Sequence, residues 1–493
     1  MRKSFLICLL LAIVTFSVYL RVIHNGFIIL DDWDYVVRNP NLTEGFSLPN
    51  IKWAFTSFYA SNWHPITWLS LILDYRLYGL NPAGYHLTNV FIHIFATILL
   101  FILFNKMTKQ IWQSAFLAAI FAIHPLHVES VAWVAERKDV LSAFFCFLTL
   151  LFYFSYTEKR QKVWYFITIL AFSFGLMSKS MLVTVPIIML LLDIWPLDRL
   201  NSEKISFLIK EKIPFFALSI IVSIITLYAQ RAGDAINNLK EASFLLRFAN
   251  SQLAYVQYIF KTVYPINLSV FYPMYLVPTW QAVLSFLLLF IVTVMVILKR
   301  KKYPYLLVGW FWFIITLIPV IGIVKVGAQS MADRYSYIPM VGLLIIVAWG
   351  AADILKNIKY RKWILSVLAC IVIISLAVLS WIQLGYWRDS VSLLRHAIKI
   401  APYNGMLHYD MGTAYLLEQN DLGQAAKELR LSIAFNPYFA DAHYNLARIY
   451  MQLGDFDDGI EEARIASVLD PKNQRLRNYL FSCIELRKAL KGK

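Results

Sequence analysis

The chain has 493 residues and a formal net charge of +16, and 59% of its residues are apolar while only 15% are charged. Because a soluble globular protein is typically about 25% charged, this composition excludes an ordinary soluble enzyme and indicates a chain solvated mostly by lipid. The Lys and Arg residues gather in short connections between apolar runs, a pattern that sets membrane topology and argues against a nucleic-acid partner. The four cysteines have no paired spacing, so neither a disulfide framework nor a zinc site is predicted.

Eleven apolar runs recur before residue 388, each near the roughly 20 residues that a membrane-spanning helix needs. They cover residues 4–20, 77–105, 110–128, 140–157, 163–178, 181–195, 213–230, 277–298, 304–324, 335–352 and 363–387. The run at 181–195 is weaker than the others because Asp193 interrupts it. The first run follows Arg2 and Lys3 and lacks a small-residue cleavage pattern, so a retained span is predicted rather than a cleaved signal peptide.

The distribution of Lys and Arg predicts the orientation of these spans. Basic residues concentrate in alternate connections, for example in the block at residues 299–302, which a cytoplasmic N-terminus places on the cytoplasmic side. With eleven spans the C-terminus then lies outside the cytoplasm. Residues 244–263 are predicted to form a surface or re-entrant helix instead of a twelfth span, because they include Arg247 and Lys261.

The composition changes abruptly after Trp387, where the chain becomes charged and repetitive. Pro402, Pro437 and Pro471 recur at the period of a tetratricopeptide repeat. The predicted organisation is therefore all-α, with a polytopic membrane bundle at residues 1–386 and a repeat array at residues 387–493. The array contains two full repeats plus flanking helices, and its concave face is expected to bind a partner protein.

The connections on the non-cytoplasmic side are rich in Trp, His, Asp and Arg, which predicts a built cavity there. Asp31, Asp32 and Asp34 directly follow the first run. The favoured interpretation is a general base or cation ligand, and the alternative is a solvated helix exit. His64 lies in the same connection.

The second outer connection holds His124, His127 and Glu129 close to a compact run of charges. A metal site is disfavoured because no H-E-x-x-H pattern occurs and Pro125 interrupts the helix, so substrate orientation or loop packing is the preferred role.

The charged run itself comprises Glu136, Arg137, Lys138 and Asp139. Two hypotheses stay open for it, which are an interfacial ion-pair cluster and phosphate binding by Arg137 or Lys138.

Two further cations are candidates for binding phosphate. Lys179 is a lone charge between two apolar runs, and such residues are often functional, although the side chain can also extend to the membrane surface. Arg334 lies between Asp333 and Tyr335 and can hold a phosphate through two hydrogen bonds, or pair with Asp333 alone. No nucleotide-binding motif of the P-loop or Rossmann type occurs in the sequence.

Long segments of these connections resemble a known family. DDWDYVVRNPNL, NWHPITWLSLILDYRLYGLNPAGYHLTN, HPLHVESVAWVAERKDVLS, GLMSKSMLVTVP, LDIWPL, NLSVFYP and ADRYSYIP resemble the membrane part of transmembrane and tetratricopeptide-repeat proteins. These are GT-C-type membrane glycosyltransferases related to protein O-mannosyltransferases, and the short loops suggest a bacterial member. The resemblance implies transfer of a sugar from a polyprenyl-phosphate donor to an acceptor outside the cytoplasm, with Asp31 or Asp32 as the catalytic carboxylate.

This scheme assigns roles to the polar residues. A carboxylate takes the proton of an acceptor hydroxyl, which is expected to be a Ser or Thr of a protein, while Arg334, Lys179, Arg137 and Lys138 stabilise the donor phosphate. The substrate cavity is expected to include His64, His124, His127, Glu129, Glu136, Asp333 and Tyr335. The expected partners are therefore the lipid-linked sugar, the acceptor protein and the lipid of a bacterial inner membrane, with a divalent cation left open. The alternatives are a transporter or flippase of lipid-linked sugar and a non-enzymatic scaffold.

Overall fold

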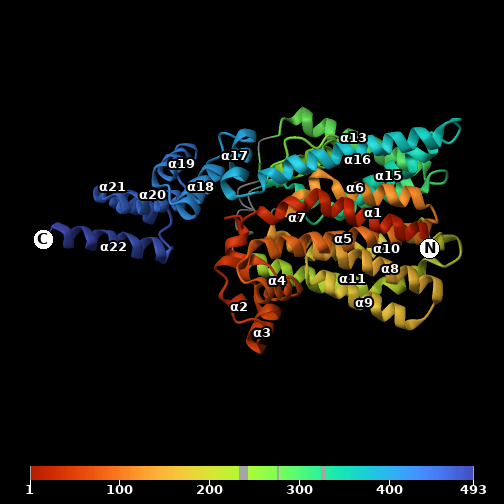
Figure 1. Cartoon of the computed structure of the whole chain (residues 1–493), viewed down its shortest axis with the longest axis horizontal. Coiled ribbons are helices and arrows are strands. Elements are labelled where there is room, and N and C mark those ends of the chain that lie inside the picture. The colour runs from red at the N-terminus through yellow and green to blue at the C-terminus, as the bar shows by residue number, and fades with distance from the viewer. Residues whose placement is uncertain (1, 233–242, 275–276, 324–328, 492–493) are drawn as a thin grey trace. The chain divides into compact units, whose positions relative to one another are not determined.

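A computed structural model describes residues 2–232, 243–274, 277–323 and 329–491, and these are helical almost throughout (Figure 1). Within these ranges the strands are β1 (Tyr272–Pro273) and β2 (Gln329–Met331), which pair antiparallel. The predicted all-α class is confirmed.

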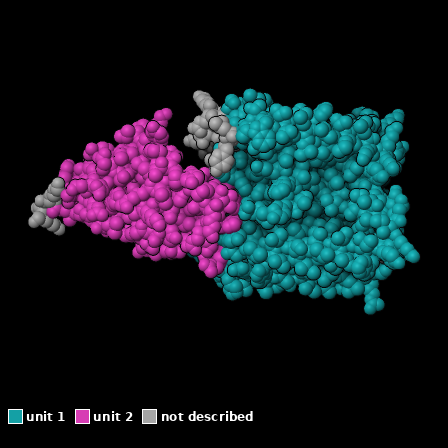
Figure 2. All heavy atoms as spheres, turned by 90° about the horizontal axis from the view of Figure 1, so that it is seen from above, with its two compact units in different colours: residues 1–27, 32–268, 272–387 teal, residues 28–31, 269–271, 388–493 magenta. Residues whose placement is uncertain are grey.

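The chain divides into two compact units (Figure 2). The membrane unit comprises residues 1–27, 32–268 and 272–387, and the repeat unit comprises residues 28–31, 269–271 and 388–493. The repeat unit therefore includes two short segments from the connections of the membrane part. One of these segments ends at Asp31, so the neighbouring carboxylates Asp31 and Asp32 belong to different units.

The membrane unit is built from long helices joined by shorter helical segments, of which the 3₁₀ and π helices are labelled η. Its helices are α1 (Arg2–Tyr19), η1 (Leu20–His24), η2 (Trp33–Val37), α2 (Pro40–Thr43), α3 (Leu48–Thr56), η3 (Tyr59–Ser61), α4 (Pro65–Tyr78), α5 (Pro82–Thr108), α6 (Ile111–Ile123), η4 (Pro125–His127), α7 (Val128–Ala132), η5 (Val134–Glu136), α8 (Arg137–Lys159), α9 (Lys162–Leu176), η6 (Ser180–Thr184), α10 (Val185–Ile194), η7 (Arg199–Asn201), α11 (Ile205–Ala232), α12 (Phe244–Val263), α13 (Thr279–Lys299), α14 (Pro304–Leu317), η9 (Asp333–Ser336), α15 (Met340–Ile354) and α16 (Arg361–Tyr386).

Six helices in the described ranges are long and apolar enough to cross a membrane, or seven if α6 and the bent segment Pro125–Ala132 form one span. Four other predicted runs are shorter apolar helices, namely Lys162–Leu176, Ser180–Ile194, Pro304–Leu317 and Met340–Ile354. The predicted end of one run, residue 324, lies outside the described residues. Helix α12 does not meet the criteria for a span.

Local sequence sets where the central helices begin and how closely they pack. Helix α5 starts after Asn81, whose side chain accepts a hydrogen bond from the Ala83 N–H at 3.2 Å, with Pro82 in the first turn. It packs against α1, α6 and α8 at the centre of the bundle. Helices α14 and α15 approach closely at Gly309 and Gly342, where a Cβ on Gly309 would lie 2.5 Å from the Gly342 carbonyl oxygen. Glycine is required at this crossing.

The repeat unit stacks helices in antiparallel pairs. It contains α17 (Ser390–Ile400), α18 (Gly405–Ala414), η10 (Tyr415–Gln419), α19 (Leu422–Phe435), α20 (Ala440–Leu453), α21 (Phe456–Leu469) and α22 (Gln474–Lys491). Each pair is closed by the same contact, a histidine of the first helix bonded to a glutamate of the second. The Nδ1 of His408 lies 2.7 Å from Glu428, and the Nδ1 of His443 lies 2.6 Å from Glu462.

Candidate functional site

The helical path of the chain bends after α6, and this bend brings the residues of the site together. Pro125 follows the last turn of α6, and the axis bends by 52° between Ile111–Ile123 and Pro125–Ala132. The chain then passes through α7 and η5 before α8 begins at Arg137. This path places Glu129 and the charged run of residues 136–139 beside Lys179 and η9, which come from distant parts of the sequence.

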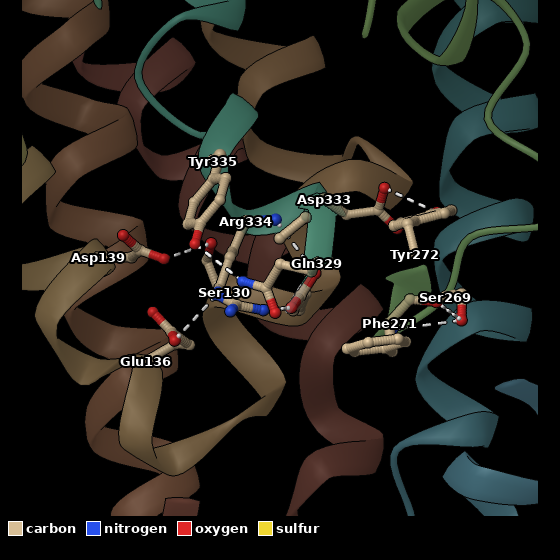
Figure 3. Close-up of polar contacts among 12 residues, drawn as sticks. Ser130, Glu136, Asp139, Ser269, Phe271, Tyr272, Gln329, Asp333, Arg334 and Tyr335 are labelled. Atoms are coloured by element: carbon tan, nitrogen blue, oxygen red, sulfur yellow. Dashed lines mark hydrogen bonds and ion pairs between the residues drawn. The ribbon is translucent and has the colours of Figure 1, made fainter. Parts of the chain in front are cut away.

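Six side chains form what is termed here the Arg334 network, namely Glu129, Glu136, Lys138, Asp139, Lys179 and Arg334. Figure 3 labels three of them, Glu136, Asp139 and Arg334. The Arg334 guanidinium pairs with Glu129 and, through Nε, with Glu136 at 3.2 Å, and its backbone N–H donates to Glu129 at 3.1 Å. Lys138 lies 3.1 Å from Glu136. Lys179 pairs with Asp139 and lies 3.5 Å from Glu136. Three acids and three bases therefore balance in one connected cluster.

The two charge types differ in their access to solvent. The cationic side chains of Arg334, Lys138 and Lys179 are 11%, 11% and 13% exposed, whereas the three carboxylates are only 1–3% exposed. The three carboxylates are thus enclosed and hold the three cations in place. The cations keep a small solvent-exposed area, so they are the groups of the network that a ligand can contact. This arrangement suits an anion and disfavours a metal ion.

Aromatic rings flank the cations. The Arg334 guanidinium lies 5.3 Å from the centroid of Trp133 and 5.1 Å from that of Tyr335. The Lys138 ammonium lies 4.9 Å from the ring of Tyr35. These distances are within the range of cation–π attraction, which restricts the cations to one geometry. The Tyr335 hydroxyl accepts a hydrogen bond from Gln329 at 2.9 Å (Figure 3).

The electrostatic environment fixes the charge states of Arg334, a member of the network, and of His64, which lies near the network. Burial acts to lower the pKa of the Arg334 guanidinium, but the carboxylates of Glu129 and Glu136 outweigh it and hold that pKa well above the ordinary value. Burial, followed by the charge of Lys138, lowers the pKa of His64 well below its ordinary value. His64 is therefore a neutral imidazole at pH 7, and its buried Nε2 has no hydrogen-bond partner among the described residues.

The two candidate catalytic carboxylates are held differently. Asp32 is fully buried, and its Oδ1 accepts a hydrogen bond from the Ala135 N–H at 2.7 Å. Since Ala135 directly precedes Glu136, this bond ties Asp32 to the backbone of the Arg334 network. Asp31 is only partly buried and lies in the repeat unit.

Arg137 does not join the network, although it was a candidate for phosphate binding. Its guanidinium is fully buried and donates to Ser70 at 2.7 Å, Asp74 at 2.5 Å, the Tyr85 carbonyl at 2.9 Å, and Asn89. These contacts connect the start of α8 to α4 and α5. An anion cannot reach this guanidinium without displacing them.

The histidines of the second connection are used for packing. The Nε2 of His124 lies 3.0 Å from the Thr262 carbonyl oxygen, and the Nδ1 of His127 lies 2.7 Å from that of Phe121. Both side chains are fully buried. In the described ranges, no group of three or more His, Cys, Asp or Glu side chains is arranged to hold a metal ion. Asp333 accepts hydrogen bonds from the Tyr272 hydroxyl at 2.9 and 3.0 Å.

A second ionic network in the membrane unit was not predicted. This Lys212 network joins Asp193, Glu211, Arg199 and Lys212 with the Tyr153 hydroxyl. The signal available in the sequence was Asp193, the one charge that interrupts an apolar run, because a carboxylate at such a position needs a cationic partner.

Comparison with known proteins identifies related sequences. A tetratricopeptide-repeat family model matches residues 416–480. Protein O-mannosyl-transferase F38B6.6 of Caenorhabditis elegans is 24% identical over 85% of this chain and 61% of its own length. Protein O-mannosyl-transferase TMTC1 of Homo sapiens is 24% identical over 87% and 55%, and Tmtc1 of Drosophila melanogaster is 31% identical over 38% and 23%. The chain spans less than two thirds of the length of these relatives.

Proposed function

We propose that this chain is a membrane glycosyltransferase that moves a sugar from a polyprenyl-phosphate donor to a Ser or Thr hydroxyl of a protein. The observation that carries the proposal is the Arg334 network, in which three partly open cations lie on three buried carboxylates. The names of the related proteins, all protein O-mannosyl-transferases, support the same reaction class. They also support mannose as the first sugar to test.

The cations stabilise the leaving group of this reaction. When the bond between the anomeric carbon and the phosphate oxygen breaks, negative charge grows on the lipid phosphate. Arg334, Lys138 and Lys179 supply fixed positive charge for it, and because their buried partners already hold them in place, little reorganisation is needed during the reaction. Arg137 is omitted from this set because its guanidinium is enclosed.

The carboxylates at residues 31 and 32 divide two tasks. The acceptor oxygen forms a bond to the anomeric carbon as the phosphate leaves, and the hydroxyl proton passes to a carboxylate. We assign this base to Asp31, the more exposed of the two, and assign Asp32 to holding the segment through the Ala135 N–H. A positioned general base contributes about 10²–10⁴-fold to such a step. Direct attack inverts the anomeric configuration.

His64 and the repeat unit complete the proposal. The unpartnered Nε2 of His64 offers a neutral hydrogen bond to the sugar or the phosphate. The repeats bind the acceptor protein. The reaction takes place on the non-cytoplasmic side of a bacterial inner membrane, and the N-terminus is cytoplasmic. The distribution of Lys and Arg supports this orientation.

Purified full-length protein, given polyprenyl-phosphate mannose and a Ser/Thr-containing acceptor, tests the proposal. We expect Asp31→Asn to lower transfer by about 10²-fold or more. Asp34→Asn is the matched control, since Asp34 is exposed and lies in the same segment. Arms with EDTA and with added Mg²⁺ measure any need for a divalent cation. Full transfer by both Asp31→Asn and Asp32→Asn would remove the carboxylate base from the scheme.

Two further results would favour the alternatives. Movement of the lipid-linked sugar across a vesicle membrane without transfer would indicate a flippase. Unchanged glycosylation of cell-envelope proteins after deletion of the gene would indicate a scaffold.

A further inference from the structure

The segment that carries Asp31 is anchored within the repeat unit. Residues 28–31 cluster with residues 388–493, and Ile28 is fully buried. The backbone N–H of Ile29 donates to the Ser390 hydroxyl at 2.8 Å. Ser390 is the first residue of α17, so this bond joins two segments that are 361 residues apart in sequence.

The Ser390 hydroxyl is itself fixed by a second bond. It donates to the Glu418 carboxylate at 2.5 Å while it accepts from Ile29. Ser390 is fully buried, whereas Glu418 is exposed. A hydroxyl that donates to a carboxylate no longer rotates freely, so its two acceptor lone pairs keep fixed directions, and the Ile29 N–H bonds to the oxygen along one of them.

A repeat-unit carboxylate also lies near Asp31. Burial, and next the negative charge of Asp31, raise the pKa of Asp410 on α18 to about 7. Asp31 and Asp410 are therefore close enough for their charges to interact.

We infer that Ser390, held by Glu418, is a positioning residue for the proposed catalytic base Asp31, since both residues belong to the repeat unit. The inference rests on the proposed function. The bond at Ile29, two residues before Asp31, limits where the backbone of that carboxylate can move. A displacement of about 1 Å in a reacting group is enough to reduce a rate by up to about 10²-fold.

The test compares Ser390→Ala with Ser432→Ala in the full-length protein. Ser432 is a matched control because it is a fully buried serine of the same unit whose hydroxyl donates to the Gly405 carbonyl at 2.8 Å. We expect Ser390→Ala to lower kcat by about tenfold or more with an unchanged KM for the lipid-linked donor. Ser390→Thr retains the hydroxyl and is expected to restore kcat. Ser432→Ala is expected to leave both constants near wild type.

A second measurement separates the inference from the proposed function. Hydrogen exchange of the Ile29 amide is expected to accelerate in Ser390→Ala and Glu418→Ala, but not in Ser432→Ala. Faster exchange with unchanged kcat would overturn the positioning role and leave Asp31 as the base. Equal effects of Ser390→Ala and Ser432→Ala on kcat would also overturn it. Failure of the proposed function is detected independently. Absence of transfer by the wild-type protein would contradict the transferase, and full transfer by Asp31→Asn would remove Asp31 as the base.

Discussion

The membrane unit contains two ionic networks with the same kinds of residue and different access to solvent. In the Lys212 network the acids and the cations are both enclosed, with Lys212 at 0% and Arg199 at 5% exposure. In the Arg334 network only the acids are enclosed. Charge balance therefore does not distinguish a structural network from a binding site. The distinguishing property is which member of the network remains reachable.

The Lys212 network is the place where one substitution is expected to have the largest effect on stability. Lys212→Ala leaves two buried carboxylates with Arg199 as their remaining cation, and breaking a buried pair in this way costs about 3–5 kcal/mol. Thermal unfolding in detergent measures the loss. Lys210→Ala on the same helix is the control, because Lys210 is exposed.

A double substitution sharpens this result. Asp193→Leu with Lys212→Met removes both charges of one pair, and apolar replacement of a buried pair is often neutral or stabilising. We expect the double variant to recover most of the stability and to transfer sugar normally. A large loss of transfer in this variant would show that the Lys212 network also serves the reaction.

Arg137 tests the same distinction within one helix. Arg137→Lys keeps the charge but loses most of the contacts to Asn89, Ser70 and Asp74, and hydrogen bonds of charged groups are worth about 1.5–3 kcal/mol. We expect the unfolding temperature to fall while the KM for the donor is unchanged. Lys138→Ala is expected to show the opposite pattern, since Lys138 is the partly open neighbour.

Lys179 is expected to affect binding more than folding. Lys179→Ala removes one of the three reachable cations, and we expect kcat/KM for the lipid-linked donor to fall about 10–100-fold, equivalent to roughly 1.4–2.7 kcal/mol. Lys179→Arg is expected to retain part of the activity. Lys159→Ala serves as the control because Lys159 is exposed and lies at the last residue of α8, whereas the network residues of α8 lie in its first turn. Equal activity of Lys179→Ala and Lys159→Ala would contradict the anion site.

The repeat unit contains two ion pairs whose cation is a histidine, which titrates near neutral pH. Their expected effect on stability is the smallest of those considered. The bond to Glu428 raises the pKa of His408. Burial acts to lower the pKa of His443, but the bond to Glu462, the bond to the Pro437 carbonyl and the charge of Glu462 together raise it above its ordinary value. A raised pKa in the folded state stabilises the fold fully below about pH 6.5, and this contribution is lost as the pH rises through the folded value.

We therefore expect amide exchange in α18 and α20 to accelerate between pH 6 and pH 8 beyond the intrinsic pH dependence. A His408→Gln, His443→Gln double variant is expected to lack this extra acceleration. The same extra acceleration in the double variant would show that other groups are responsible.

Much of the architecture follows from the sequence because its signals are local. Apolar runs of membrane length, the proline period after Trp387 and the polar connections between the runs can all be recognised without knowing which segments meet. The acids at residues 31–34 were identified in the same way, since carboxylates next to an apolar run are unusual. Helix length in the structure then separates the six long candidate spans from the shorter apolar helices.

The pairings within the site could not be derived in this way. Arg334 pairs with Glu129, 205 residues away in the sequence, whereas the carboxylate partner suggested by the sequence was its neighbour Asp333. Arg137 and Lys138 are neighbours in sequence, but successive residues of a helix point about 100° apart, so one enters the contact with α4 and α5 while the other reaches Glu136. No local pattern states which of the two faces inward.

The sequence by itself determined that this chain is an all-α membrane protein with a repeat array and polar connections between its apolar runs, because hydropathy and repeat period are properties of consecutive residues. The tertiary structure alone decided which charges are enclosed, which cations stay open, and that Asp31 and Asp32 belong to different units. Those properties depend on contacts between segments hundreds of residues apart, and burial, which sets the energy of a charge, exists only after those segments have packed.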